Sequence, residues 1–156
     1  MKQHIVIALL LVLLLPLACS TDQETQQAES QAETNQALNQ ASDQVVVAYL
    51  HGNRRCYTCE KLETFSHNSV MNGFGPQLAD GSLIWQVANF EDDKYAYLVD
   101  RYGLFTQSLI VSRYVDGQEV DWKNLDKIWE TVGDEEQFTS YVQSEISSFV
   151  EVAESN

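Results

Sequence analysis

The stretch VVVAYLHGNRRCYTCE, residues 45–60, decides how the folded part of this chain is interpreted. It opens with a continuous apolar run rich in valine, which is typical of a strand buried on both faces. Gly52 and the polar residues 53–55 end the run, and we expect a helix to begin near Cys56. Two cysteines, Cys56 and Cys59, therefore follow the carboxyl end of the first predicted strand.

The next part of the chain predicts a second strand followed by a second helix. Residues 66–81 are interrupted by glycine and proline and indicate a loop or a broken helix, and residues 82–90 predict a strand. Asp92 can cap the helix that follows. The apolar positions of that helix recur at helical spacing before Gly103, where a helix would stop: Tyr95, Leu98, Val99 and Tyr102.

The last third predicts a hairpin and a final helix. Residues 108–122 form the hairpin, with Asp116–Gly117 as its two-residue turn. Asp134 caps the last helix, and Gln137 completes a capping box. The resulting order is β-α-β-α-β-β-α, which predicts a single α/β domain with a mixed sheet over residues 44–156.

The N-terminal residues have the features of an export signal. Lys2 supplies positive charge, and residues 5–15 form an unbroken apolar run of 11 residues. This run is too short to cross a bilayer as a permanent helix, so residues 1–18 predict a secretory signal peptide.

The segment LLPLAC, which ends at Cys19, resembles the bacterial lipobox, although Pro16 stands where that motif usually has leucine. The resemblance implies lipid attachment to Cys19, and Ser20 implies sorting to the outer membrane, with the protein on the periplasmic face of the cell envelope. The alternative is an ordinary signal peptide cleaved near Ala18, which would leave Cys19 as a free thiol.

Residues 19–43 predict a lipidated, flexible tether. From residue 20 to residue 43 there is no aromatic or β-branched aliphatic side chain, so the segment cannot bury enough apolar surface to order itself. Its alanines leave a transient helix as an alternative. The chain carries a net charge of −14, and loss of Lys2 with the signal would leave −15, which argues against nucleic acid and anionic lipid surfaces as partners.

In an oxidising compartment, Cys56 and Cys59 must pair with each other, with a partner protein or with a metal. The first turn of a helix favours the thiolate through its free N–H groups and dipole. Arg54 and Arg55 would lower the thiol pKa further, with His51 as another tuning group. Cys56 would then be the nucleophile and Cys59 the resolving cysteine.

Simpler interpretations of the same residues stay open. The pair could be a static disulfide, or could bind a soft metal or arsenite with His51 as a third ligand. Arg54 and Arg55 could simply pair with carboxylates such as Glu60 and Glu63. We assign no metal site from the sequence, because a structural zinc site normally needs four ligands and no second CxxC motif occurs.

The order of elements and the place of the CxxC motif resemble the thioredoxin-like superfamily over residues 45–151. That family carries a cis-proline before the strand that faces its CxxC motif, in a loop that binds substrate backbone. Aligned on Tyr102–Gly103, this chain has Ser108 there. The resemblance therefore implies Thr106, Gln107 and Ser108 as the substrate loop.

Three segments are similar to a narrower family of small bacterial thioredoxin-like proteins, often labelled "nitrophenyl compound nitroreductase subunit" or arsenic-operon-associated. They are VVVAYLHGNRRCYTCEKLE, YGLFTQSLIVSRYVDG and WKNLDKIWETVGDEEQF. We expect no cofactor, because the chain has neither a GxGxxG motif nor a basic phosphate-binding loop for a flavin.

These observations together predict a membrane-tethered, extracytoplasmic thiol–disulfide oxidoreductase. Its partners would be protein or small-molecule disulfides, the membrane through Cys19, and a DsbD-like membrane electron carrier. The competing hypothesis is a lipoprotein that binds soft metal or arsenite through the same dithiol without turnover. A third is an interaction protein with a permanent disulfide.

Overall fold

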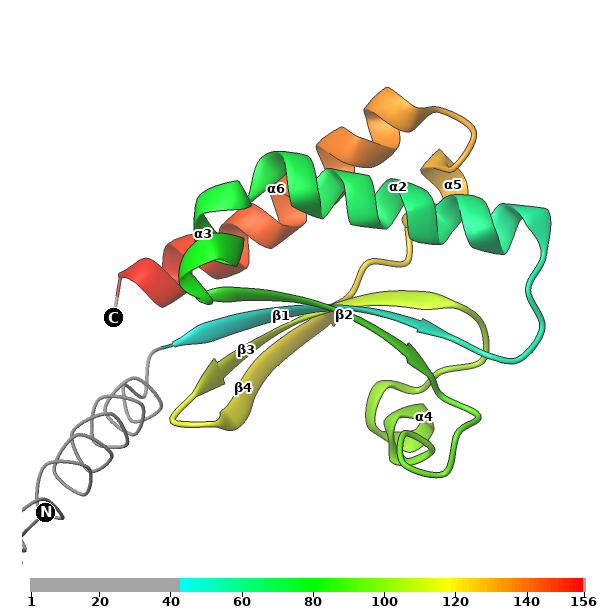
Figure 1. Cartoon of the computed structure of the whole chain (residues 1–156), viewed down its shortest axis with the longest axis horizontal. Coiled ribbons are helices and arrows are strands. Elements are labelled where there is room, and N and C mark those ends of the chain that lie inside the picture. Colours follow the sequence, from blue (N-terminus) through cyan, green and yellow to red (C-terminus); the bar gives the residue numbers. More distant parts are fainter. Residues whose placement is uncertain (1–42, 156) are drawn as a thin grey trace, which may run out of the picture. The chain divides into compact units, whose positions relative to one another are not determined.

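The valine-rich run forms β1 (Gln44–His51), an interior strand of a four-stranded sheet in the computed structural model, which describes residues 43–155 (Figure 1). The strand order is β2-β1-β3-β4. β2 (Leu83–Asn89) runs parallel to β1, while β3 (Ser108–Val115) runs antiparallel to it. β4 (Gln118–Asn124) pairs antiparallel with β3. The side chains of β1 are buried on both faces of the sheet, which is why almost all of its residues are apolar, as predicted.

The structure confirms the two-residue turn of the predicted hairpin. Asp116 and Gly117 both have positive φ, at 52° and 74°. This is the backbone that the two-residue turn requires, and Asp and Gly tolerate it better than other residues. The register shifts between Arg113 and Tyr114, so β4 carries an irregularity near its start.

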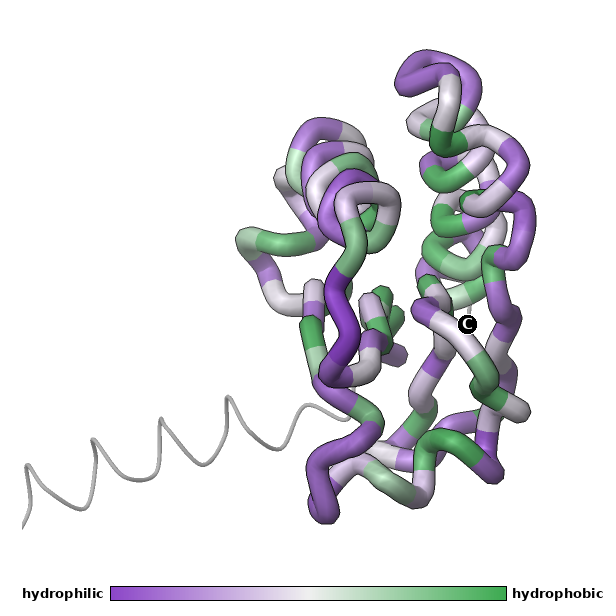
Figure 2. The backbone as a smooth tube through the Cα atoms, turned by 90° about the vertical axis from the view of Figure 1, so that its right-hand side faces the viewer, coloured by the Kyte–Doolittle hydropathy of each residue, from purple (hydrophilic) through white to green (hydrophobic). Residues whose placement is uncertain are grey.

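Helices cover the two faces of the sheet unequally (Figure 1). One face carries α2 (Tyr57–Gly73), α3 (Gly75–Asp80), α5 (Ile128–Thr131) and α6 (Glu135–Glu154). The other face carries α4 (Tyr97–Tyr102). Figure 2 shows hydrophilic and hydrophobic residues interleaved along the helices, which is the pattern of helices with one buried face.

Two hydrophobic clusters follow from this arrangement. The larger cluster lies between the sheet, α2 and α6 and includes the fully buried Tyr49, Leu62 and Phe138. The smaller cluster lies under α4 and includes Leu98 and Tyr102. The elements that carry Cys56 and Cys59 are attached to the larger cluster.

The observed order of elements confirms the predicted α/β fold with a mixed sheet, to which the structure adds the short helices α3 and α5. A central strand with one parallel and one antiparallel neighbour, a closing hairpin and helices on both faces is the thioredoxin-like arrangement. The signal peptide, Cys19 and the tether up to residue 42 lie outside the described residues. Within residues 43–155, no helix is both long enough and apolar enough to span a bilayer.

Some helix boundaries differ from the predictions. The prediction that Asp92 caps a helix is wrong: α4 begins at Tyr97 with Ala96 before it. The intervening residues form a turn instead, in which the Tyr95 N–H donates to the Asp92 carbonyl at 2.9 Å. The glycine-rich stretch 66–81 is the broken helix of the two alternatives, because α2 continues to Gly73 before α3 begins.

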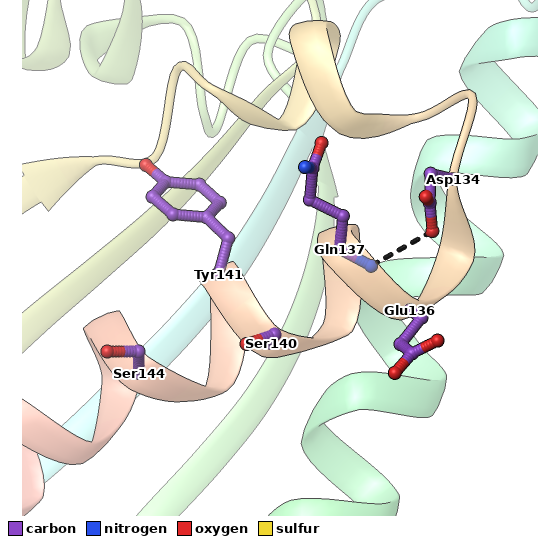
Figure 3. Close-up of a pocket in the computed structure, with 6 residues that line it drawn as sticks. All are labelled: Asp134, Glu136, Gln137, Ser140, Tyr141 and Ser144. Atoms are coloured by element: carbon purple, nitrogen blue, oxygen red, sulfur yellow. Dashed lines mark hydrogen bonds between the residues drawn. The ribbon is translucent and has the colours of Figure 1, made fainter.

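The start of α6 agrees with the sequence. Asp134 is the N-cap residue, and its carboxylate accepts the Gln137 N–H at 3.1 Å (Figure 3). This bond satisfies one of the free N–H groups of the first turn, as an N-cap requires. The second half of the predicted capping box is not formed, because the Asp134 N–H donates to the Thr131 carbonyl at 2.9 Å and not to the Gln137 side chain.

Candidate functional site

Cys56 and Cys59 form a disulfide with each other at the start of α2, with their Cα atoms 4.9 Å apart. Cys56 is the N-cap residue, and its Sγ accepts the Cys59 N–H at 3.1 Å. The Cys56 carbonyl accepts the Glu60 N–H at 3.0 Å, which closes the first helical turn. One sulfur atom therefore sits at the positive end of a 17-residue helix, where free N–H groups favour negative charge.

The two sulfur-bearing residues differ in exposure. Cys56 is exposed, whereas Cys59 is only 4% exposed and belongs to the core. A bulky reagent or protein can therefore approach Cys56 but not Cys59. This asymmetry is what an attacking cysteine and a resolving cysteine require.

Tyr49 ties the buried half of the disulfide to the sheet. Its hydroxyl donates to the Cys59 carbonyl at 2.7 Å, inside the core. Burial raises the pKa of the Tyr49 hydroxyl above its ordinary value, so the hydroxyl stays protonated and keeps donating at neutral pH. No sequence motif predicts this role for Tyr49; the one available signal is that Tyr49 is the only side chain of VVVAYL with a polar atom.

The two arginines before Cys56 have different surroundings. The Arg55 guanidinium forms an ion pair with Glu63, on the next turn of α2 beyond Cys59. No partner of the Arg54 guanidinium is found among residues 43–155, and the residue is exposed. Arg54 thus contributes an uncompensated positive charge two residues before Cys56, while the charge of Arg55 is largely neutralised.

The HGN segment before these arginines is anchored to the end of β2. Asn53 donates to the Glu91 carboxylate from its backbone N–H at 2.9 Å and from its side-chain amide at 2.7 Å. A Cβ on Gly52 would lie 2.3 Å from Glu91 Oε1, so glycine leaves room for this carboxylate. The Gly52 carbonyl accepts from His51 Nδ1 at 2.9 Å. His51 is therefore fixed locally, with its Nδ1 protonated.

The predicted substrate loop lies against the segment that leads into the disulfide. The Gln107 side-chain amide donates to the Arg54 carbonyl at 2.9 Å. The indole N–H of Trp129, from α5, donates to the Gln107 carbonyl at 3.0 Å. Gln107 is thus held from both ends, and its own carbonyl already has a donor.

The other two loop residues are engaged locally. The Ser108 hydroxyl, 5% exposed as a residue, donates to the Thr106 carbonyl at 3.1 Å. The Thr106 hydroxyl donates to Gln107 Oε1 at 3.1 Å. The structure therefore brings the three loop residues to the end of the sheet that carries Cys56 and Cys59. Of the three, only Gln107 has a side-chain hydrogen bond to the segment before Cys56.

Neither a metal-binding cluster nor a second reactive site accompanies the disulfide in the part of the chain that the structure describes. Within residues 43–155, no three His, Cys, Asp or Glu side chains gather closely enough to hold a metal ion. A surface hollow on α6 has a polar lining (Figure 3). Burial raises the pKa of its Tyr141 hydroxyl to about 12, so this hydroxyl stays protonated near neutral pH. The lining residues are Asp134, Glu136, Gln137, Ser140, Tyr141 and Ser144.

Among solved structures, the chain is similar to Trxlp from Edwardsiella tarda EIB202, known from a crystal structure. The two share 23% sequence identity with a TM-score of 0.33, over 59% of this chain and 79% of that chain. No family model and no curated protein matches the chain. The fold assignment rests on the strand order and register described above, and the candidate site on the geometry around Cys56.

Proposed function

We propose that this protein is a thiol–disulfide oxidoreductase that works from the periplasmic face of a membrane to which lipid on Cys19 tethers it. The observation that carries the proposal is the disulfide itself. It joins an exposed sulfur at a helix N-terminus to a buried one, both at the carboxyl end of the central strand. Ligand sites in open α/β sheets gather at this edge.

In the reducing direction, the Cys56 thiolate attacks one sulfur of a substrate disulfide. A bond forms between that sulfur and Cys56 Sγ, the substrate disulfide breaks, and the second substrate sulfur leaves as a thiolate that takes a proton from solvent. Cys59 then loses its proton, and its thiolate attacks Cys56 Sγ. The protein disulfide forms, the first substrate sulfur leaves, and two electrons have passed from the dithiol to the substrate.

Neighbouring groups support this chemistry at stated atoms. The Cys59 N–H, which donates to Cys56 Sγ in the disulfide, would donate to the Cys56 thiolate after reduction. The Arg54 charge favours the same thiolate. Tyr49 holds the Cys59 backbone so that the second sulfur stays within reach of the first.

Electrons for repeated reduction would come from a DsbD-like membrane carrier, because the proposed compartment holds no soluble reductase. We also propose, from the three sequence segments quoted above, that the chain belongs to the small family labelled as nitroreductase subunits. Its proposed activity here is still exchange at the dithiol, because the sequence has neither a GxGxxG motif nor a basic phosphate-binding loop for a flavin.

The test is the reduction potential of the pair, measured on the full chain in detergent with Cys19→Ser so that Cys56 and Cys59 are the only thiols. Equilibration in graded thiol–disulfide buffers followed by mass tagging counts the free thiols. We expect a reversible midpoint between about −270 and −120 mV, the range of exchange catalysts. A pair still oxidised below about −300 mV would be a structural disulfide and would overturn the proposal.

The proposed partner has its own test. Cys59→Ser stalls exchange at the mixed disulfide on Cys56, so the partner stays covalently bound. We expect one membrane protein with paired cysteines to be captured from the host envelope, and none by Cys56→Ser. Capture of an unselective mixture of envelope proteins would contradict a dedicated carrier.

A further inference from the structure

Arg54 differs from every other lysine and arginine between residues 43 and 155. Each of the others has a carboxylate or an aromatic ring as its partner, although the chain has 23 acidic residues against 9 basic ones. The carboxylate pairs are Arg55–Glu63, Arg101–Glu119, Arg113–Asp43 and Lys123–Glu145. The ring pairs are Lys61–Phe65, Lys94–Tyr95 and Lys127–Tyr141.

The position of Arg54 is fixed by its backbone. Its carbonyl accepts from the Gln107 amide at 2.9 Å, so Arg54 lies where the segment before Cys56 meets the 106–108 loop. Its exposed side chain, two residues before Cys56, has no ion-pair or ring partner among residues 43–155. In so acidic a chain, this leaves a cation that no carboxylate of the described domain neutralises, two residues before Cys56.

Two exposed aromatic side chains accompany this charge. Tyr57, the residue after Cys56, is 83% exposed, and Phe105, two residues before Gln107, is 93% exposed. Aromatic side chains with this much exposure are common on surfaces that bind other proteins. The charge and the rings belong to the two segments that Gln107 joins.

We propose that Arg54, with Tyr57 and Phe105 beside it, selects protein disulfides in which an acidic residue lies next to the target cysteine. The inference rests on the proposed exchange activity, whose bond changes are those written above, and it adds the substrate class. The net charge of −14 repels strongly acidic proteins, so the recognised feature is a local Asp or Glu and not an acidic surface. An arginine fork suits such a carboxylate.

The experiment uses the reduced full chain with Cys19→Ser and three fluorogenic disulfide peptides. They are identical except that the residue before the cysteine is Glu, Gln or Lys. We expect the second-order rate constant to be about fivefold higher for the Glu peptide than for the Lys peptide, the size of a partly exposed charge pair. Added salt should shrink that ratio.

Two variants separate recognition from thiol activation. Arg54→Gln should abolish the ratio between the Glu and Lys peptides, and Arg54→Glu should invert it. The matched control is Arg55→Gln, which removes the adjacent but paired cation and should keep the ratio, whatever it does to the three rates together.

Equal rates for the three wild-type peptides would overturn the inference and leave the proposed activity intact. An Arg54→Gln variant that slows all three peptides by one common factor would also overturn it, because Arg54 would then act only on the thiol. Failure of the reduced wild-type protein to react with any peptide would instead overturn the proposed function.

Discussion

Tyr49 and Tyr102 are both buried tyrosines whose hydroxyls donate a hydrogen bond, but they lie on opposite faces of the sheet. Tyr49, in the larger cluster under α2, donates to the neutral Cys59 carbonyl at 2.7 Å. Tyr102, in the smaller cluster on α4, donates to the Glu119 carboxylate, which also pairs with Arg101. The Tyr49 hydroxyl positions the backbone of the candidate site, whereas the Tyr102 hydroxyl binds a residue of the edge strand β4.

The comparison separates stability from function within one sheet. The face with α2 and α6 supplies most of the packing and carries the disulfide, so a change there can alter both the fold and the redox chemistry. The face with α4 has less apolar cover and adds a charged anchor between α4 and β4. Changes there should affect stability without reaching Cys56.

The largest expected effects on the free energy of unfolding come from replacing one large buried side chain in each hydrophobic cluster with alanine. Phe138 is fully buried and packs edge to face on Phe65, so Phe138→Ala should lower the free energy of unfolding by about 3–5 kcal/mol. Leu98, 9% exposed in the smaller cluster, should cost about 2–3 kcal/mol when replaced by alanine. Urea unfolding of the oxidised proteins measures both. An equal or larger loss for Leu98→Ala would remove the asymmetry between the faces.

The tyrosine pair tests the separation of roles directly. Tyr49→Phe and Tyr102→Phe each remove one hydroxyl and keep the ring, so each should lower the free energy of unfolding by about 1–2 kcal/mol. Only Tyr49→Phe should slow alkylation of Cys56 in the reduced protein, because the first turn of α2 would hold the Cys59 N–H on Sγ less firmly. The alkylation rate against pH distinguishes the two. A matching change in Tyr102→Phe would mean that Cys56 responds to global stability alone.

Alkaline pH extends the same comparison. Burial raises the pKa of both hydroxyls; Glu119 adds to the effect at Tyr102, while Arg55 opposes it at Tyr49. An unfolded tyrosine loses its proton near pH 10 while the folded one keeps it, so the stabilisation is complete below about pH 10 and falls as pH rises further.

Each such tyrosine should steepen the loss of unfolding free energy above about pH 10 by up to about 1.4 kcal/mol per pH unit. Tyr49→Phe and Tyr102→Phe should each flatten the wild-type curve, and the double variant should flatten it twice as much. Urea unfolding at several pH values between about 9 and about 11.5 measures how the free energy of unfolding depends on pH. Curves parallel to wild type would show that these hydroxyls titrate normally in the folded protein.

Local pattern predicted much of this fold, because strands and caps are specified by neighbours in the chain. The apolar run before Gly52 and the Asp116–Gly117 turn needed no distant partner to be identified. The start of α4 was misplaced, because Asp92 resembles a cap but its carbonyl is used in a turn with Tyr95. Helix α5, four residues long, is too short to give a periodic signal.

The candidate site was predicted in its residue types and not in its contacts. CxxC spacing after a strand identifies the sulfur atoms, but the choice of Arg55 over Arg54 as partner of Glu63 depends on the direction in which each side chain leaves the loop. The Asn53–Glu91 bond joins residues 38 apart in sequence, so no local signal specifies it. Tertiary packing alone brings such pairs together.

The smallest expected effect concerns Trp129, which belongs to the α2–α6 face but makes its polar contact at the loop. Its indole N–H donates to the Gln107 carbonyl, and the residue is 37% exposed, so Trp129→Phe should cost only about 0.5–1 kcal/mol of unfolding free energy. The loss frees the carbonyl of the loop that Gln107 links to Arg54. Reaction with the acidic disulfide peptide should therefore change more than stability does, whereas Leu98→Ala, which costs more stability, should leave that reaction unchanged. If both variants changed the rate in proportion to their loss of unfolding free energy, the 106–108 loop would act only as a structural part of the fold. The two faces of the sheet would then not differ in their effect on substrate binding at Cys56.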